Sequence, residues 1–317
     1  MRAPDRTPQP LAASAQFALP NAAGQNLVAF NVGPDRVAYF VFALEELDYL
    51  DAGFAKATHD QPQRFRVVAM REDDVELDIE IADEPFNLHL VQPLGDGILV
   101  ACARSVYRGP ADVDLNARLY DRAGHLQRAF CIGDGIESIQ ATSTGDIWAA
   151  YFDEGVLGNR GWPEPLGSSG LVAWDDNGAK RYEFEPCAGL NRIIDCYALN
   201  VASHDDVWLC YYIGFPLVHM RRRRVHAFYE TPVRGSSALA IGHQHVLFAG
   251  DHDDRQTLRL LPLITGRTLS LAAVFQPTDR DGAPIDISRA VGRGDSLFLV
   301  DDKNLYVHAI SDAIGSL

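Results

Sequence analysis

The chain has 317 residues, of which 47% are apolar, and its 28 basic and 43 acidic residues give a formal net charge of -15. The apolar fraction excludes a disordered chain, and a strongly acidic surface repels the phosphate backbone of nucleic acids, so we expect no nucleic-acid partner. The longest apolar run, Val37 to Leu44, has eight residues, whereas a membrane-spanning helix needs about 20. We therefore expect no membrane partner either.

The N-terminal segment and the cysteines indicate a cellular compartment. Residues 1–10 contain three prolines, and no unbroken apolar core of the kind that a signal peptide requires follows them. The five cysteines are widely spaced, and no two of them form a Cys-x-x-Cys pair. Because unpaired thiols are typical of a reducing compartment, we expect a cytoplasmic protein.

One sequence unit recurs along the chain. Each copy has a short alternating strand, a polar turn that usually contains Gly or Asp, and a strongly apolar strand. The six copies are Leu27–Phe42, Asn87–Cys102, Ser138–Tyr151, Ala198–Tyr211, Ala238–Ala249 and Arg289–Val300. A period near 50 residues, with four short strands in each unit, is typical of the blades of a β-propeller.

Six units account for nearly the whole sequence, so we predict an all-β, six-bladed β-propeller with four antiparallel strands per blade. The predicted blades are approximately residues 26–83, 86–132, 136–186, 195–230, 236–276 and 286–310. The sixth unit lacks sequence for its fourth strand, and an open strand edge promotes aggregation. We therefore predict that residues 14–19 supply this strand, which makes residues 1–317 a single domain.

Residues 119–151 contain an Asp-x-x-Gly hairpin, a loop and a Gly-x-Ile-x-Ala strand in succession. This stretch resembles the repeats of NHL-type and TolB-like six-bladed propellers, although such repeats often carry Pro-x-Gly-Ile where this chain has Ile136-Glu-Ser-Ile139. Residues 151–162 and 195–201 look like segments of bacterial propellers of unassigned function. The resemblance implies a fold and a bacterial relative, and it implies no chemistry.

The candidate site lies on the loops at one end of the blades, around the axial mouth, because function usually concentrates on loops that a rigid scaffold holds. The segment 153–170 is longer than most loops of compact domains. The candidate ligand-binding residues are Asp153, Glu154, Asn159 and Trp162 on this segment, with Glu137, Asp195 and Tyr197 at the entries of neighbouring blades. Arg160, Asp134, Asp251 and His252 lie near the same mouth. A second insertion, 45–63, is a candidate lid with a short helix.

We expect an interaction or ligand-binding module with a protein or small-molecule partner and no cofactor, because no catalytic or nucleotide-binding motif is present. The alternative is a metal-dependent hydrolase or lactonase. Gluconolactonase and regucalcin-like propellers, which this chain resembles in fold, imply a divalent cation held by Glu, Asn and Asp at the mouth. That alternative requires three or more of Asp153, Glu154, Asp195, Glu137 and Asn200 to converge on one point. The sequence assigns no metal ligand.

Overall fold

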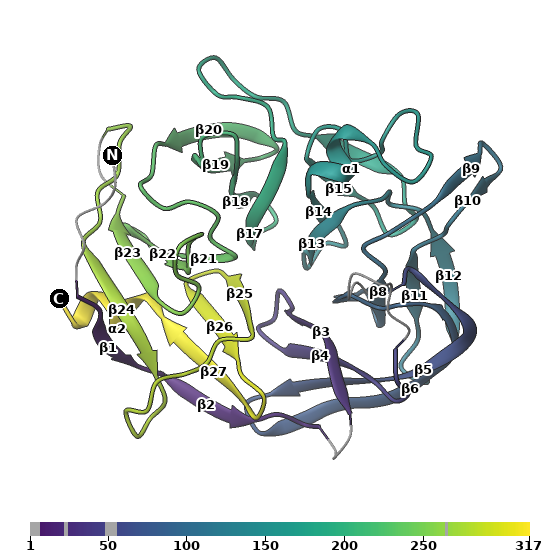
Figure 1. Ribbon diagram of the computed structural model, residues 1–317, viewed down its shortest axis with the longest axis horizontal. Helices are drawn as coiled ribbons and strands as arrows, with labels where there is room; N and C mark the ends of the chain where they lie inside the picture. The colour runs from purple at the N-terminus through teal and green to yellow at the C-terminus, as the bar shows by residue number, and fades with distance from the viewer. Residues whose placement is uncertain (1–6, 22–24, 48–55, 264–265) are drawn as a thin grey trace. The chain divides into compact units, whose positions relative to one another are not determined.

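The computed structural model describes residues 7–21, 25–47, 56–263 and 266–317. These residues form six four-stranded antiparallel blades in sequence order, the fifth of which has one additional parallel strand, and a separate two-stranded hairpin (Figure 1). The prediction of an all-β, six-bladed β-propeller is therefore confirmed. In the part of the chain that the structure describes, neither helix has the length and hydropathy needed to cross a membrane.

The chain divides into two compact units, and each contains three blades. Residues 20–184 form the unit of blades one to three, and residues 1–19 with 185–317 form the unit of blades four to six. The expectation that residues 1–317 are a single domain stays a prediction.

Blades one to three are meanders in which each strand pairs with the next along the chain. Blade one contains β3 (Asn26–Val32), β4 (Ala38–Ala43), β5 (Thr58–Arg71) and β6 (Asp74–Phe86). Blade two contains β7 (Leu90–Leu94), β8 (Gly97–Ala101), β11 (Ala117–Tyr120) and β12 (Leu126–Phe130), with a small hairpin of β9 (Tyr107–Gly109) and β10 (Asp112–Val113) inserted after β8. Blade three contains β13 (Ile136–Ala141), β14 (Ile147–Tyr151), β15 (Leu171–Trp174) and β16 (Lys180–Glu183).

Blades four to six repeat this arrangement. Blade four contains β17 (Asp195–Ser203), β18 (Asp206–Tyr212), β19 (Leu217–Arg221) and β20 (Arg224–Tyr229). Blade five contains β21 (Ala238–Ile241), β22 (His245–Ala249), β23 (Leu258–Pro262) and β24 (Ala273–Thr278). Blade six contains β25 (Arg289–Arg293), β26 (Ser296–Val300) and β27 (Asn304–Ala309), which the C-terminal helix α2 (Ile310–Gly315) follows.

An N-terminal strand completes blade six, as the sequence predicts. The strand β2 (Ala15–Ala18) pairs antiparallel with β27, and Phe17 lies opposite Leu305. The sequence does not predict the strand before it. That strand, β1 (Gln9–Ala12), pairs parallel with β24 as a fifth strand of blade five, and it buries Leu11 in the core shared by blades five and six.

Asp side chains accept hydrogen bonds from backbone N–H groups in the turns of several β-hairpins. The Asp121 carboxylate accepts hydrogen bonds from the backbone N–H groups of Ala123 and His125, both at 2.9 Å, and Gly124 takes a positive φ of 82°. The same pattern recurs at Asp175 in blade three. Asp and Gly are favoured at such turns because Asp caps the backbone amides and Gly adopts positive φ without a steric penalty.

The core lies between the blades, where apolar side chains from adjacent sheets pack together. One cluster joins blades one and two, a second joins two and three, a third joins four and five, and a fourth joins five and six. Trp208 belongs to the cluster of blades four and five.

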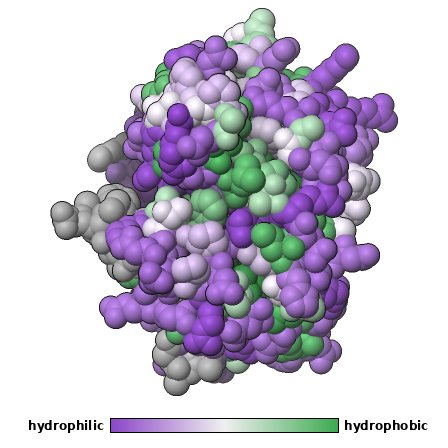
Figure 2. Space-filling view, turned by 90° about the vertical axis from the view of Figure 1, so that its right-hand side faces the viewer, coloured by the Kyte–Doolittle hydropathy of each residue, from purple (hydrophilic) through white to green (hydrophobic). Residues whose placement is uncertain are grey.

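Figure 2 shows the side of the molecule on which β9, β10 and β12 lie in Figure 1. Hydrophilic side chains cover most of this surface, and hydrophobic ones gather near its centre.

Two expectations about the insertions need correction. Residues 58–63, which the sequence assigns to the second insertion, belong to the long strand β5, and part of the proposed helix, 48–50, lies outside the described residues. The segment 153–170 begins with a short helix, α1 (Asp153–Leu157), rather than with an irregular loop. Polar and apolar residues do not alternate along residues 58–63, so only their pairing with β6 identifies them as part of a strand.

Candidate functional site

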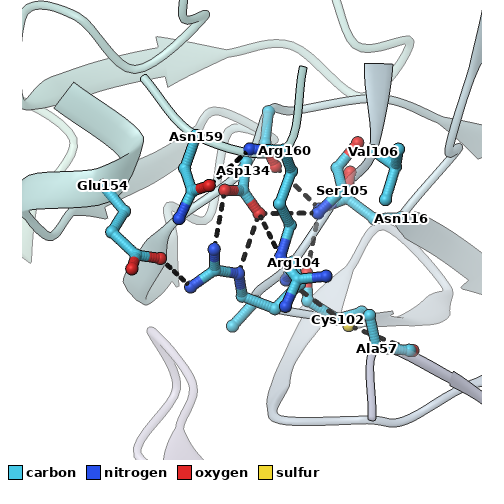
Figure 3. Close-up of polar contacts among 12 residues, drawn as sticks. Ala57, Cys102, Arg104, Ser105, Val106, Asn116, Asp134, Glu154, Asn159 and Arg160 are labelled. Carbon is cyan, nitrogen blue, oxygen red and sulfur yellow. Dashed lines mark hydrogen bonds and ion pairs between the residues drawn. The ribbon is translucent and has the colours of Figure 1, made fainter. Parts of the chain in front are cut away.

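Loops of blades two and three bring two arginines and two carboxylates together. Arg104 follows β8, Asp134 lies between β12 and β13, and Glu154 lies in α1 (Figure 3). Arg104 binds Asp134 with two hydrogen bonds, from Nε to Oδ1 at 2.9 Å and from Nη2 to Oδ2 at 3.0 Å. Its remaining Nη1 lies 2.5 Å from Glu154 Oε2. We call Arg104, Asp134, Glu154, Asn159 and Arg160 the polar loop cluster.

Asp134 is the buried centre of this cluster. Its side chain is 3% exposed, and its Oδ1 also accepts the backbone N–H of Ser105 at 2.9 Å. Burial raises the pKa of the Asp134 carboxyl, while the Ser105 N–H and the charges of Arg104 and Arg160 oppose this rise. A buried carboxylate is costly unless it is paired and hydrogen-bonded, so Arg104 and Ser105 make this position tolerable.

Glu154 lies at the exposed side of the cluster. Burial alone would raise the pKa of the Glu154 carboxyl, but hydrogen bonds from Arg104 and Asn159 and the charges of both arginines lower it below its usual value. Arg104 also lies over the ring of Phe152, 5.2 Å from its centroid. The guanidinium of Arg104 therefore has a partner on each side and connects the loops of both blades.

Trp162 joins the long segment of blade three to the inserted hairpin of blade two. Its Nε1 donates to the Ser105 carbonyl at 2.8 Å, and its ring centroid lies 5.2 Å from that of Tyr107. Tyr107 N–H donates to the carbonyl of Arg160 at 3.0 Å. A side chain at Gly161 would place Cβ 2.4 Å from the Tyr107 carbonyl oxygen, so only glycine allows this close approach.

Loops of blades four and five form a second cluster of different chemistry. Tyr197 lies on β17, Tyr212 and Phe215 lie at and after the end of β18, and His252 follows β22. The ring centroids of Tyr197 and Phe215 are 5.6 Å apart, and the edge of His252 contacts both rings, at 5.5 Å and 5.3 Å. The Tyr212 ring lies 5.7 Å from that of Phe215. We call these four residues the aromatic loop cluster.

The aromatic loop cluster exposes apolar surface. Tyr212 is 44% exposed and the adjacent Ile213 is 43% exposed. The His252 ring packs on Gly235, where an added Cβ would lie 2.4 Å from a ring atom. The imidazole is therefore fixed in place by Gly235 and the two neighbouring rings, and the cluster is a preformed surface.

The structure brings together some of the predicted site residues and separates others. Glu154 and Asn159 lie in the polar loop cluster, and Trp162 packs beside it through Ser105. Asp153 is exposed, and its Oδ1 accepts the backbone N–H of Glu154 at 2.7 Å. Glu137 lies exposed on β13. Asp195 and Tyr197 belong to the other compact unit, and their predicted approach to blade three stays a prediction.

Sequence analysis missed three residues of these clusters. It did not single out Arg104, Tyr212 or Phe215, and it noted Arg160 only as part of the long loop. The available signal was their position, because each lies at or just after the end of the second strand of a blade, where the loop to the third strand begins. Residue type alone does not distinguish such positions from an exposed arginine or a core aromatic.

One of the residues proposed as metal ligands is buried inside the fold. Asn200 is completely buried, and its amide donates to the carbonyls of Leu239 at 2.7 Å and Gly294 at 2.9 Å and accepts the Gly294 N–H at 3.0 Å. Its side chain therefore connects blade four to the backbone of blades five and six. Within the described residues, no group of three or more His, Cys, Asp or Glu side chains is placed to hold a metal ion.

The fold and these loops define a six-bladed β-propeller, the class of protein to which the chain belongs. A family model described as the YxzG family matches residues 186–308, which extend from the entry of blade four into β27. A search of curated protein sequences finds no significant match.

Three solved structures are similar over most of their length. A chain of a mitotic checkpoint complex has a TM-score of 0.53 at 8% identity and covers 96% of this chain and 98% of its own. The β-propeller domain of Cps50 (Swd1) from Myceliophteria thermophila has a TM-score of 0.51 at 11% identity, covering 93% and 85%. Hsv2 from Kluyvelomyces marxianus has a TM-score of 0.50 at 10% identity, covering 90% and 77%. Identities this low show a shared fold alone.

Proposed function

We propose that this chain is an interaction module that binds a partner protein through the mouth loops of its blades, with the aromatic loop cluster as the main contact. The observation that carries the proposal is the exposure of Tyr212 and Ile213 beside the fixed rings of Phe215 and His252. Contiguous exposed apolar residues mark interaction sites, and tyrosine is enriched among residues that dominate binding energy.

Preorganisation supports the same proposal. Ordering side chains on binding costs about 0.5–1.5 kcal/mol for each flexible side chain. The rings of Tyr197, Phe215 and His252 are already packed against one another, so a partner would order little except Tyr212 and Ile213. β-Propellers commonly act as interaction scaffolds, which is consistent with this use.

Several finer expectations belong to this proposal. None of the five cysteines forms a disulfide, and Cys102, Cys196 and Cys210 are buried, which supports the cytoplasm as the proposed compartment. The relationship to NHL-type or TolB-like bacterial propellers, the absence of a nucleic-acid partner and the contribution of Asp153, Glu137 and Asp195 to one mouth stay predictions. The metal-dependent hydrolase also stays an untested alternative, and no observation in the described residues favours it.

A capture experiment tests the proposal. The chain would be immobilised as wild type, as the double variant Tyr212→Ser with Ile213→Ser, and as the control Leu126→Ser, which changes an equally exposed apolar residue on β12. We expect at least one protein that wild type and control retain equally and that the double variant loses about tenfold or more, corresponding to about 1.4 kcal/mol. Equal retention by all three forms would contradict the proposed contact surface.

A further inference from the structure

The two arginines of the polar loop cluster are used very differently. Arg104 donates from Nε, Nη1 and Nη2 to the two carboxylates. Arg160 approaches the same Asp134 Oδ1, but its Nε lies 3.9 Å away, which is too long for a hydrogen bond. Within the described residues, the Arg160 guanidinium makes no hydrogen bond, and its Nε is buried.

A partly buried guanidinium without hydrogen bonds is unfavourable, even beside the carboxylate of Asp134. The Arg160 side chain is 31% exposed, so much of it is removed from water. A guanidinium has five N–H donors arranged to bind a carboxylate or a phosphate with two parallel hydrogen bonds. Asp134 Oδ1 is already occupied by Arg104 and by the Ser105 N–H, so it has little capacity left for Arg160.

The charges of the cluster favour an added anion. Arg104 and Arg160 carry two positive charges, and the buried Asp134 carries one negative charge. The second negative charge comes from Glu154, whose side chain is 43% exposed and forms an ion pair with Nη1 of Arg104. Without Glu154 the site has a net positive charge, in a chain whose total formal charge is -15.

The backbone holds Arg160 toward this site. Arg160 has a φ of 45°, and the following Gly161 has a φ of 85°, so the chain turns sharply here. The Arg160 N–H is capped by Asn159 Oδ1 at 2.7 Å, and its carbonyl accepts Tyr107 N–H. Figure 3 shows the side chain extending from this turn to the side of Asp134 where Arg104 lies.

We propose that Arg160 and the Nη1 atom of Arg104 together bind an oxyanion, which is either a carboxylate or a phosphate group of a ligand. Glu154 occupies part of this site until the ligand displaces it. The ligand anion would bind the free N–H groups of Arg160 and replace the Glu154 carboxylate on Arg104. This site lies on blades two and three, and it is independent of the aromatic loop cluster.

Calorimetric titration of the purified chain with inorganic phosphate and, separately, with succinate tests this site. Arg160→Gln removes the guanidinium that makes no hydrogen bond within the described residues, and we expect it to weaken binding of the preferred anion at least tenfold. Glu154→Gln removes the competing carboxylate, and we expect it to strengthen binding severalfold. Arg108→Gln is the matched control, because this arginine of the neighbouring hairpin already pairs with Asp114 at 2.8 Å and should bind like wild type.

The two anions distinguish the source of the oxyanion, since phosphate binding alone indicates a phosphorylated ligand and succinate binding alone a carboxylate. Thermal unfolding of each variant without anion separates a binding defect from a folding defect. The proposal would be overturned if neither anion bound wild type, if Arg160→Gln retained the wild-type affinity, or if Glu154→Gln bound more weakly while remaining folded. Retained anion binding in the Tyr212→Ser, Ile213→Ser variant would show that the two sites are separate.

Discussion

The polar loop cluster and the aromatic loop cluster occupy corresponding places in their blades but use them in opposite ways. Both consist mainly of residues that follow the second strand of a blade or lie near the entry of the next. The polar cluster surrounds the buried Asp134 with hydrogen bonds, whereas the aromatic cluster leaves Tyr212 and Ile213 exposed. Buried groups with hydrogen-bond partners, such as Asp134, contribute to stability, while the exposed apolar side chains of Tyr212 and Ile213 are available to a partner.

The largest expected effect is on stability, from Arg104→Ala. This change leaves Asp134 buried without its bidentate partner, and breaking a buried ion pair in this way costs about 3–5 kcal/mol. The free energy of unfolding, measured with urea, checks the prediction. Arg108→Ala is the control, since the Arg108 side chain is 47% exposed against 17% for Arg104, and we expect a smaller loss. Equal losses in both variants would remove the distinction between a buried and an exposed pair.

The cost of Arg104→Ala should depend on pH. The pKa of Asp134 is already above its ordinary value because of burial, and losing Arg104 raises it further. A carboxyl whose pKa is higher in the folded than in the unfolded state lowers stability when it is ionised, and this cost disappears as the pH falls through the folded pKa. The stability difference from wild type should therefore shrink as the pH falls from neutral through the raised pKa of Asp134. A difference that grows on acidification would contradict this account.

Trp162→Phe should lower the free energy of unfolding by less than Arg104→Ala does, through contacts between the same loops of blades two and three. It removes the indole N–H that binds the Ser105 carbonyl and leaves an aromatic ring beside Tyr107. Loss of one such hydrogen bond costs about 1–2 kcal/mol when the partner has no replacement. Urea unfolding measures this loss, and hydrogen exchange of the Tyr107 amide shows whether the two loops separate. An unchanged stability would mean that Trp162 does not hold the inserted hairpin.

The smallest stability effect is expected in the aromatic loop cluster. Tyr212→Ser with Ile213→Ser changes two exposed side chains, and surface substitutions usually alter the free energy of unfolding by no more than about 0.5 kcal/mol each. The same variant should lose the captured partner. A large loss of stability would instead assign these side chains to the fold and would remove the contrast between the two clusters.

The sequence by itself determined the blades and how the last one closes. Strand alternation and Asp-x-x-Gly turns are local signals contained within a few neighbouring residues, and the period near 50 residues is visible by comparing such segments along the chain. Because the sixth unit lacks sequence for a fourth strand, the N-terminal segment is predicted to supply one, and β2 does so. The same reasoning selected Glu154, Asn159, Trp162 and Tyr197 from their positions on mouth loops, without identifying their contacts.

Only the tertiary structure decided which side chains meet and which remain open. Arg104 meets Asp134, 30 positions away in the chain, and no local pattern encodes such a contact. The short strand β1 is recognisable only from its parallel pairing with β24. Asn200 looked like a possible metal ligand in the sequence, but packing directs its amide to the backbone of blades five and six. Burial and partner geometry depend on residues distant in sequence, and they distinguish Arg104, which is hydrogen-bonded to carboxylates, from Arg160, whose guanidinium makes no hydrogen bond within the described residues.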